Sequence, residues 1–115
     1  MRVLILAKEE PGSGPATAPT PEAMAEHQKF NEELVRAGVV IGSGRLSPSA
    51  HGKRVRFAGK SRTVIDGPFT EAKELVAGYW LWEVRSLDEA IEWLKRAPYA
   101  GGTFEVREIA MHEGA

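Results

Sequence analysis

The sequence predicts an α+β domain in which two helices lie on one face of an antiparallel sheet. Two segments, Arg2–Ala7 and Leu75–Val84, are apolar at both alternating sets of positions, which is typical of central strands. Two other segments place apolar residues at helical spacing behind good N-cap residues. Because the chain has 115 residues, we interpret residues 1–115 as a single domain with a modest core.

The chain begins with the strand Arg2–Ala7 and continues into a long loop. Residues 8–20 contain three prolines and the run Gly12-Ser13-Gly14, so neither a helix nor a strand ladder is expected there. This loop is either a linker or a lid over a pocket, and both interpretations stay open.

The first helix is predicted to start at Thr20 as N-cap, with Pro21 at the first helical position, and to run to about Ala37 before Gly38. At helical spacing, its inward stripe consists of Ala23, His27, Phe30 and Leu34. His27 is therefore expected on the inward face, where a titratable side chain can serve a site.

The middle of the chain predicts three more strands. Val39–Leu46 is a strand weakened by two glycines, which often mark a bulge or the close approach of another group. Lys53–Phe57 alternates apolar with polar residues and, together with Ser61–Ile65, predicts a hairpin across Ala58–Lys60.

The last third supplies a strand, a helix and a final strand. Along Leu75–Val84, alternation separates one face with Val76, Trp80, Trp82 and Val84 from another with Leu75, Ala77, Tyr79 and Leu81. Ser86 and Glu89 match a capping box, so a helix begins there and ends near Ala97, before a proline. Thr103–Ile109 is predicted as the closing strand.

Without the hairpin, this order is the ferredoxin-like βαββαβ arrangement, in which the first and third core strands are central. Those are the two strands that are apolar on both faces. Two helices cover only one face of such a sheet, and each large apolar side chain left exposed forfeits about 1.5–3 kcal/mol. We therefore expect a homodimer that packs through the open sheet face. The alternative is that the inserted hairpin folds over this face.

Composition excludes several classes of protein. A formal net charge of −1 argues against a general nucleic-acid binder, and the basic residues of the hairpin are interpreted as a solvated face. The absence of cysteine excludes disulfides and thiolate catalysis. Since no apolar segment approaches the roughly 20 residues of a membrane span, we expect a cytoplasmic protein with neither a membrane nor a nucleic-acid partner.

After the hairpin comes the run D-G-P-F-T-E-A-K-E (Asp66–Glu74), followed by G-Y-W (Gly78–Trp80). This pattern resembles the DGPF branch of the YCII-related proteins, and the resemblance extends to the helix with His27 and to the closing strand. It implies a dimeric α+β barrel. Members of this family are mostly uncharacterised bacterial proteins, often encoded beside or fused to extracytoplasmic-function sigma factors, so a sigma-factor association is one expectation.

The resemblance also implies site residues. Similar YCII-type domains have been suggested to be enzymes because a His and an Asp meet in a pocket. His27 matches that histidine by its position in the first helix. The matching acid precedes a Pro-Tyr pair after the second helix, where this chain has Ala97 before Pro98-Tyr99. Asp66 is then the candidate that replaces the missing acid.

In a His27–Asp66 pair, the carboxylate would fix the imidazole tautomer and raise its basicity, which gives a general base near neutral pH. With no cysteine and no G-x-S-x-G motif, the sequence offers no obvious nucleophile, so we expect proton transfer on a small molecule without a cofactor. Residues that could orient an anionic or carbonyl-bearing substrate are Arg45, Lys73 and Tyr79.

Each candidate has a structural alternative. His27 could be a helix histidine at the edge of the core, and Asp66 could cap free backbone N–H groups after its turn. A non-catalytic small-molecule-binding or sigma-factor-associated regulatory module would use the same pocket, and a purely structural dimer domain is a third interpretation. No metal site is expected, because the three histidines are far apart and in no chelating spacing.

Overall fold

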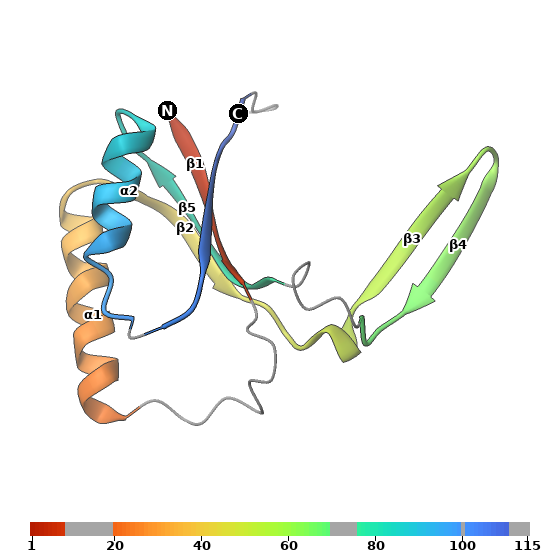
Figure 1. The fold of residues 1–115 in the computed structure, drawn as a ribbon, viewed down its shortest axis with the longest axis horizontal. Coiled ribbons are helices and arrows are strands. Elements are labelled where there is room, and N and C mark those ends of the chain that lie inside the picture. The colour runs from red at the N-terminus through yellow and green to blue at the C-terminus, as the bar shows by residue number, and fades with distance from the viewer. Residues whose placement is uncertain (9–19, 70–75, 100, 111–115) are drawn as a thin grey trace.

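The computed structural model describes residues 1–8, 20–69, 76–99 and 101–110. Figure 1 shows a sheet with both helices on one side and a long hairpin that projects away from it. In chain order the elements are β1 (Arg2–Lys8), α1 (Pro21–Arg36), β2 (Val40–Arg45), the single 3-10 turn η1 (Ser49–His51), β3 (Lys53–Ala58), β4 (Ser61–Asp66), β5 (Val76–Glu83), α2 (Leu87–Lys95) and β6 (Phe104–Glu108). Most of the loop predicted at 8–20, and with it the choice between linker and lid, lies outside the described residues.

The four core strands form an antiparallel sheet in the order β2-β5-β1-β6. This is the strand order of the ferredoxin-like fold, so the predicted α+β architecture is confirmed. The two strands that are apolar on both faces, β1 and β5, are central. The register of β2 against β5 shifts between Val40 and Gly42, which is the kind of irregularity that the glycines of β2 indicate.

Side-chain hydrogen bonds explain where both helices begin. The Thr20 hydroxyl accepts a bond from the backbone N–H of Ala23 at 3.1 Å, and the Ser86 hydroxyl accepts one from Glu89 at 3.1 Å. The Glu89 carboxylate reaches back to the N–H of Arg85 at 3.0 Å, one residue before the N-cap. Both predicted N-caps are confirmed, and each contributes about 1 kcal/mol.

The core lies between the sheet and the helices. Val3 and Ile5 of β1, Trp82 of β5 and Leu34 of α1 are fully buried, and each such side chain contributes about 1.5–3 kcal/mol. The remaining buried apolar side chains are Phe30, Val39, Val84 and Ala90. The predicted inward stripe of α1 is thus confirmed, although His27, nearer the start of the helix, is only half-buried.

The opposite face of the sheet carries a second set of apolar side chains. Strand alternation and register place Leu4 and Leu6 of β1 there, beside Leu81 and Tyr79 of β5. The Tyr79 ring lies across Gly44 of β2, where an added Cβ would come within 2.8 Å of the ring. Since α1 and α2 both lie on the other side (Figure 1), no helix of the described residues covers this face. The dimer that would cover it stays a prediction.

Within the described part of the chain, β3 and β4 pair only with each other and form a hairpin, Lys53–Asp66, which we call the arm. Figure 1 shows the arm extending away from the sheet, so it does not fold over the open face of its own chain. The turn consists of Gly59 and Lys60, one residue shorter than predicted. Gly59 adopts a φ of 58°, the left-handed backbone that a two-residue turn requires.

The motif that begins at Asp66 forms the base of the arm. The Asp66 carboxylate accepts a hydrogen bond from Lys53 Nζ at 2.5 Å and so joins the first and last residues of the hairpin. The Gly67 N–H donates to the carbonyl of Gly52 at 2.9 Å, and the Gly67–Pro68 peptide bond is cis. The described hydrogen bond of Asp66 is therefore to a side chain, not to the backbone N–H groups that the capping alternative supposed.

Phe69 makes two contacts at the base of the arm, one through its backbone and one through its ring. Its backbone N–H donates to Ser49 Oγ at 3.2 Å, and its ring lies under the guanidinium of Arg54, 3.8 Å from the ring centroid. Gly67 approaches the Ser49 carbonyl so closely that an added Cβ would lie 1.8 Å from that oxygen. The arm is thus fixed in direction at its root by several contacts between residues far apart in sequence.

We expect Gly67→Ala to loosen the arm, because the new methyl group overlaps a backbone oxygen and cannot be accommodated by a side-chain rotation. Overpacking of this kind costs about 1–3 kcal/mol, which corresponds to a roughly 5- to 150-fold larger population of the opened arm. Limited trypsin digestion, followed at the basic residues of the arm, reports this population. The matched control is Gly42→Ala, where an added Cβ meets no atom within 4 Å. Equal arm cleavage in both variants would contradict the assignment.

Candidate functional site

His27 faces an aromatic side chain from the segment after α2. Its ring meets the ring of Tyr99 edge to face, with 4.6 Å between centroids and an interplanar angle of 67°. A tight turn holds Tyr99 here, since its backbone N–H donates to the carbonyl of Ala97 at 2.9 Å. The inward position of His27 on α1 therefore leads to a contact with a phenol, contributed by a residue about seventy positions away in sequence.

Three more rings support this contact. Tyr99 packs on Phe104 of β6 with centroids 4.7 Å apart, and Phe104 stacks on Trp80 of β5 at 6.3 Å. Trp80 in turn meets Phe30 of α1 edge to face at 6.2 Å. Aromatic pairs of this kind contribute about 0.5–1.5 kcal/mol each beyond burial, so the cluster forms a firm base beneath His27 and Tyr99.

Arg45 brings a positive charge to the same place. It lies at the end of β2 opposite Gly78, and alternation puts it on the face of the sheet that carries Trp80. Burial raises the pKa of the Tyr99 phenol above its ordinary value of 10.0, and the charge of Arg45 opposes that rise. Tyr99 is therefore a neutral hydroxyl at physiological pH and can donate a hydrogen bond. Among the residues that the structure describes, no carboxylate pairs with Arg45.

We call this group the aromatic cleft, defined by His27, Arg45, Trp80, Tyr99 and Phe104. Tyr99 is 42% exposed, so solvent reaches the cleft. Tyr99 and Phe104 also line a depression of about 310 Å³ against the end of α2, with Gly101 and Gly102 at its rim. Of the cleft residues, Tyr99 and Phe104 line this depression, whereas His27 and Arg45 lie next to Tyr99 and are not among its lining residues. An imidazole, a neutral phenol and a guanidinium are thus grouped near one side of the depression.

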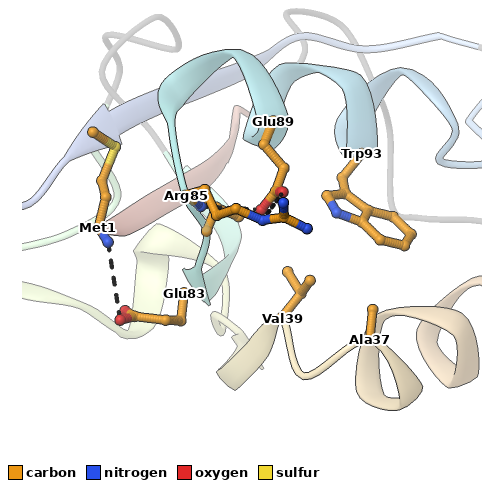
Figure 2. A pocket seen from close by; sticks show the side chains of 8 residues that line it. Met1, Ala37, Val39, Glu83, Arg85, Glu89 and Trp93 are labelled. Carbon is orange, nitrogen blue, oxygen red and sulfur yellow. Dashed lines mark hydrogen bonds and ion pairs between the residues drawn. The ribbon is translucent and has the colours of Figure 1, made fainter.

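A second depression, of about 440 Å³, lies at the opposite end of the sheet, between α2 and the start of β2. Figure 2 shows its charged groups turned toward one another. The Met1 ammonium lies 3.9 Å from Glu83, and Arg85 lies 3.3 Å from Glu89, while Trp93 forms one wall. Because these charges already compensate each other, this depression offers a ligand fewer uncompensated groups than the aromatic cleft does.

The sequence-predicted site residues are divided between several places. His27 and Arg45 both contribute to the aromatic cleft, whereas Tyr79 lies on the open face of the sheet. Asp66 is bound to Lys53 at the base of the arm, and no hydrogen bond or ion pair joins it to His27 within this chain. Lys73 lies outside the described residues. The roles of Asp66, Tyr79 and Lys73 stay predictions.

Tyr99 is the cleft residue that sequence reasoning missed. It belongs to the Pro-Tyr pair that follows α2, and the alanine two residues earlier, Ala97, stands where the resemblance expects an acid. The pair marks the end of α2, but it does not indicate in which direction the Tyr99 side chain points. The structure places a phenol, in place of a carboxylate, against His27.

A ferredoxin-like sheet with a ligand-sized cleft beside one end of its helical layer defines a small α+β domain with one candidate binding site. The model of the YCII-related domain matches residues 1–112, and the chain belongs to this family. A similar protein, described as uncharacterized, occurs in Rhizobium meliloti (strain 1021). It is 32% identical over 93 residues, which cover 78% of this chain and 75% of that protein.

In the described part of the chain, no group of three or more histidine, aspartate or glutamate side chains is arranged to hold a metal ion. None of the described helices combines the length and the apolar character that crossing a membrane requires.

The phenol of Tyr99 can be titrated separately in a Tyr79→Phe protein, because the chain contains two tyrosines. We expect a pKa above 10, and Arg45→Met should raise it further because the opposing positive charge is removed. Since the folded state holds this proton more tightly than the unfolded state does, the free energy of unfolding should fall as the pH rises above about 10. Absorbance of the phenolate measures the titration. A Tyr99 pKa at or below 10, or one that falls in Arg45→Met, would show that the cleft is wrongly described.

Proposed function

We propose that this protein binds a small anionic, carbonyl-bearing molecule in the aromatic cleft and transfers a proton on it without a cofactor. The observation that carries the proposal is the contact between His27 and Tyr99 beside the charge of Arg45, which pairs with no carboxylate of the described residues. A base, a neutral hydrogen-bond donor and a cation are the groups that acid–base chemistry next to a carbonyl requires.

Each residue has a distinct role in this proposal. Arg45 pairs with the carboxylate of the ligand, and its planar guanidinium favours a two-point contact. His27 removes a proton from the carbon beside the carbonyl, and the electrons of the broken C–H bond form an enolate. Tyr99 donates a hydrogen bond to the developing enolate oxygen. The protonated His27 then returns the proton to the same or a neighbouring carbon, so the net reaction is exchange or isomerisation.

The separation of His27 from Asp66 favours a second function, that of a non-catalytic binding module. His27 has no described contact with Asp66, so the His–Asp pair of an acid–base site is not formed within one chain. A binding module needs no such pairing, and the same cleft would bind a ligand without converting it chemically. In this alternative the protein is a small-molecule-binding or sigma-factor-associated regulatory domain.

We further propose that the protein is a cytoplasmic homodimer of the DGPF branch, with the two open sheet faces packed together as in a dimeric α+β barrel. Leu4, Leu6 and Leu81 supply the apolar centre of such an interface. On β6, hydrogen bonds from Arg107 and Lys8 lower the pKa of Glu105, which keeps the rim of this face charged and hydrated. The absence of cysteine suits a reducing compartment.

Proton transfer can be tested without knowledge of the product. We expect the protein to exchange carbon-bound protons of some member of a panel of small 2-oxo acids for deuterium in D₂O, as followed by ¹H NMR. His27→Ala should lower the exchange rate by about 10²–10⁴-fold, the usual contribution of a general base. Arg45→Met should act mainly on the apparent KM, because it removes a binding contact. His51→Ala, which alters an exposed histidine of η1, is the control.

The outcomes separate the two functions. Saturable binding that depends on Arg45, together with no exchange above the solvent rate, would support the binding module and reject the enzyme. Neither binding nor exchange across the panel would reject both.

A further inference from the structure

The arm is an unusual element for an isolated chain. A two-stranded ribbon is at best marginally stable in water unless it packs on something else. Every residue of β3 and β4 is exposed, including Phe57 at 68% and Val64 at 61%. The radius of gyration is 16.4 Å, whereas a compact chain of this length has about 13 Å, and Figure 1 shows the arm contributing to the extended shape.

The register of the arm gives it two different faces. Val55 lies opposite Val64, and Phe57 lies opposite Arg62, whose guanidinium is 4.4 Å from the Phe57 ring centroid. These four side chains share one face, which has an apolar centre. On the reverse face, Arg56 lies opposite Thr63 and Arg54 opposite Ile65, so this face is more polar but includes one large apolar side chain. The first face resembles a surface that is buried in an assembly, and the second resembles one that remains in water.

The arm also has the reach and rigidity of a docking element. Its six-residue strands are about 20 Å long at 3.4 Å per residue, and two sheets packed face to face lie about 10 Å apart. The contacts of Asp66, Gly67 and Phe69 hold its root, so little conformational entropy is lost when its far end docks. An arm of this length can therefore extend past the open face of its own sheet to a second copy.

The charge of the arm indicates which partner it docks on. The arm contains five basic residues and one acidic residue, a net charge of +4. Because the whole chain has a net charge of −1, the remainder carries −5. The arm of one copy is thus complementary in charge to the remainder of another, which favours their association.

We propose that the arm of each chain docks on a second copy of the same chain and buries the face formed by Val55, Phe57 and Val64. The proposal rests on the homodimer proposed above and goes beyond it, because sheet-to-sheet packing alone requires no arm. It gives the Asp66–Phe69 motif a structural task, which is to aim the arm at the second copy.

A basic β-ribbon is also a shape that binds nucleic acid, but the contacts of this arm disfavour that occupant. Lys53 is paired with Asp66, Arg54 lies over Phe69, and Arg62 lies over Phe57 while donating to the carbonyls of Gly59 and Ser61. Cations engaged in this way are less available to follow a phosphate backbone.

Cross-linking tests the proposal directly. Because the chain contains no cysteine, Val64→Cys and Thr63→Cys each create a single attachment point for a thiol-linked benzophenone, on opposite faces of the same strand. Mixing ¹⁴N- and ¹⁵N-labelled protein allows mass spectrometry to distinguish cross-links between chains from those within a chain. We expect cross-links between chains from position 64 and at least fivefold fewer from position 63.

Sedimentation supplies the second measurement. Phe57→Ser should raise the dimer dissociation constant at least tenfold, whereas Thr63→Ala should leave it unchanged. Leu81→Arg on the open face should give monomers and abolish the cross-links between chains.

The failures of the two proposals are distinguishable. A dimer whose position-64 cross-links all lie within one chain, or whose stability is unaffected by Phe57→Ser, would overturn the arm proposal and leave the dimer intact. A wild-type monomer at micromolar concentration would overturn both. A third outcome concerns nucleic acid. If the protein binds duplex DNA or RNA at 150 mM salt and Arg56→Ala abolishes this binding, the partner of the arm is nucleic acid and not a second copy.

Discussion

The main physical constraint on this structure is that both faces of the sheet carry apolar side chains. The helices α1 and α2 cover only one of these faces. Val3, Ile5 and Trp82 are fully buried beneath α1 and α2, while Leu4, Leu6 and Leu81 lie on the other side of the same two strands. At about 25 cal/mol per Å², leaving a row of such side chains in water gives up several kcal/mol, which is comparable to the net stability of a small domain. The homodimer that we propose would cover this second face.

The candidate site uses the covered face. α1 brings His27, the turn after α2 brings Tyr99, and β2 brings Arg45, so the cleft requires both helices and the edge of the sheet to be in place. The most recognisable motif of the sequence lies elsewhere. Asp66 and Phe69 secure the root of the arm, so the close contacts there give both residues a structural role, while a role of Asp66 in chemistry stays a prediction.

The fold could be predicted because its signals are local: N-caps at Thr20 and Ser86, and alternation along β1 and β5. The site could be predicted only in part. His27 was found because helical spacing fixes its direction, but Tyr99 follows α2 in an irregular segment, where no periodicity indicates its orientation. The pairing of Asp66 with Lys53 could have been predicted from the sequence. Once the two-residue turn at Gly59 is recognised, the register of the hairpin places Lys53 opposite Asp66.

We propose that this YCII-related protein holds its ligand in the aromatic cleft. A crystal structure of the protein soaked with a mixture of small carboxylic and 2-oxo acids can test this proposal. We expect a bound molecule with its carboxylate at hydrogen-bond distance from Arg45 and its carbonyl near the Tyr99 hydroxyl. A molecule held in the depression between Glu83 and Trp93, with the cleft filled by solvent at saturating concentration, would contradict it.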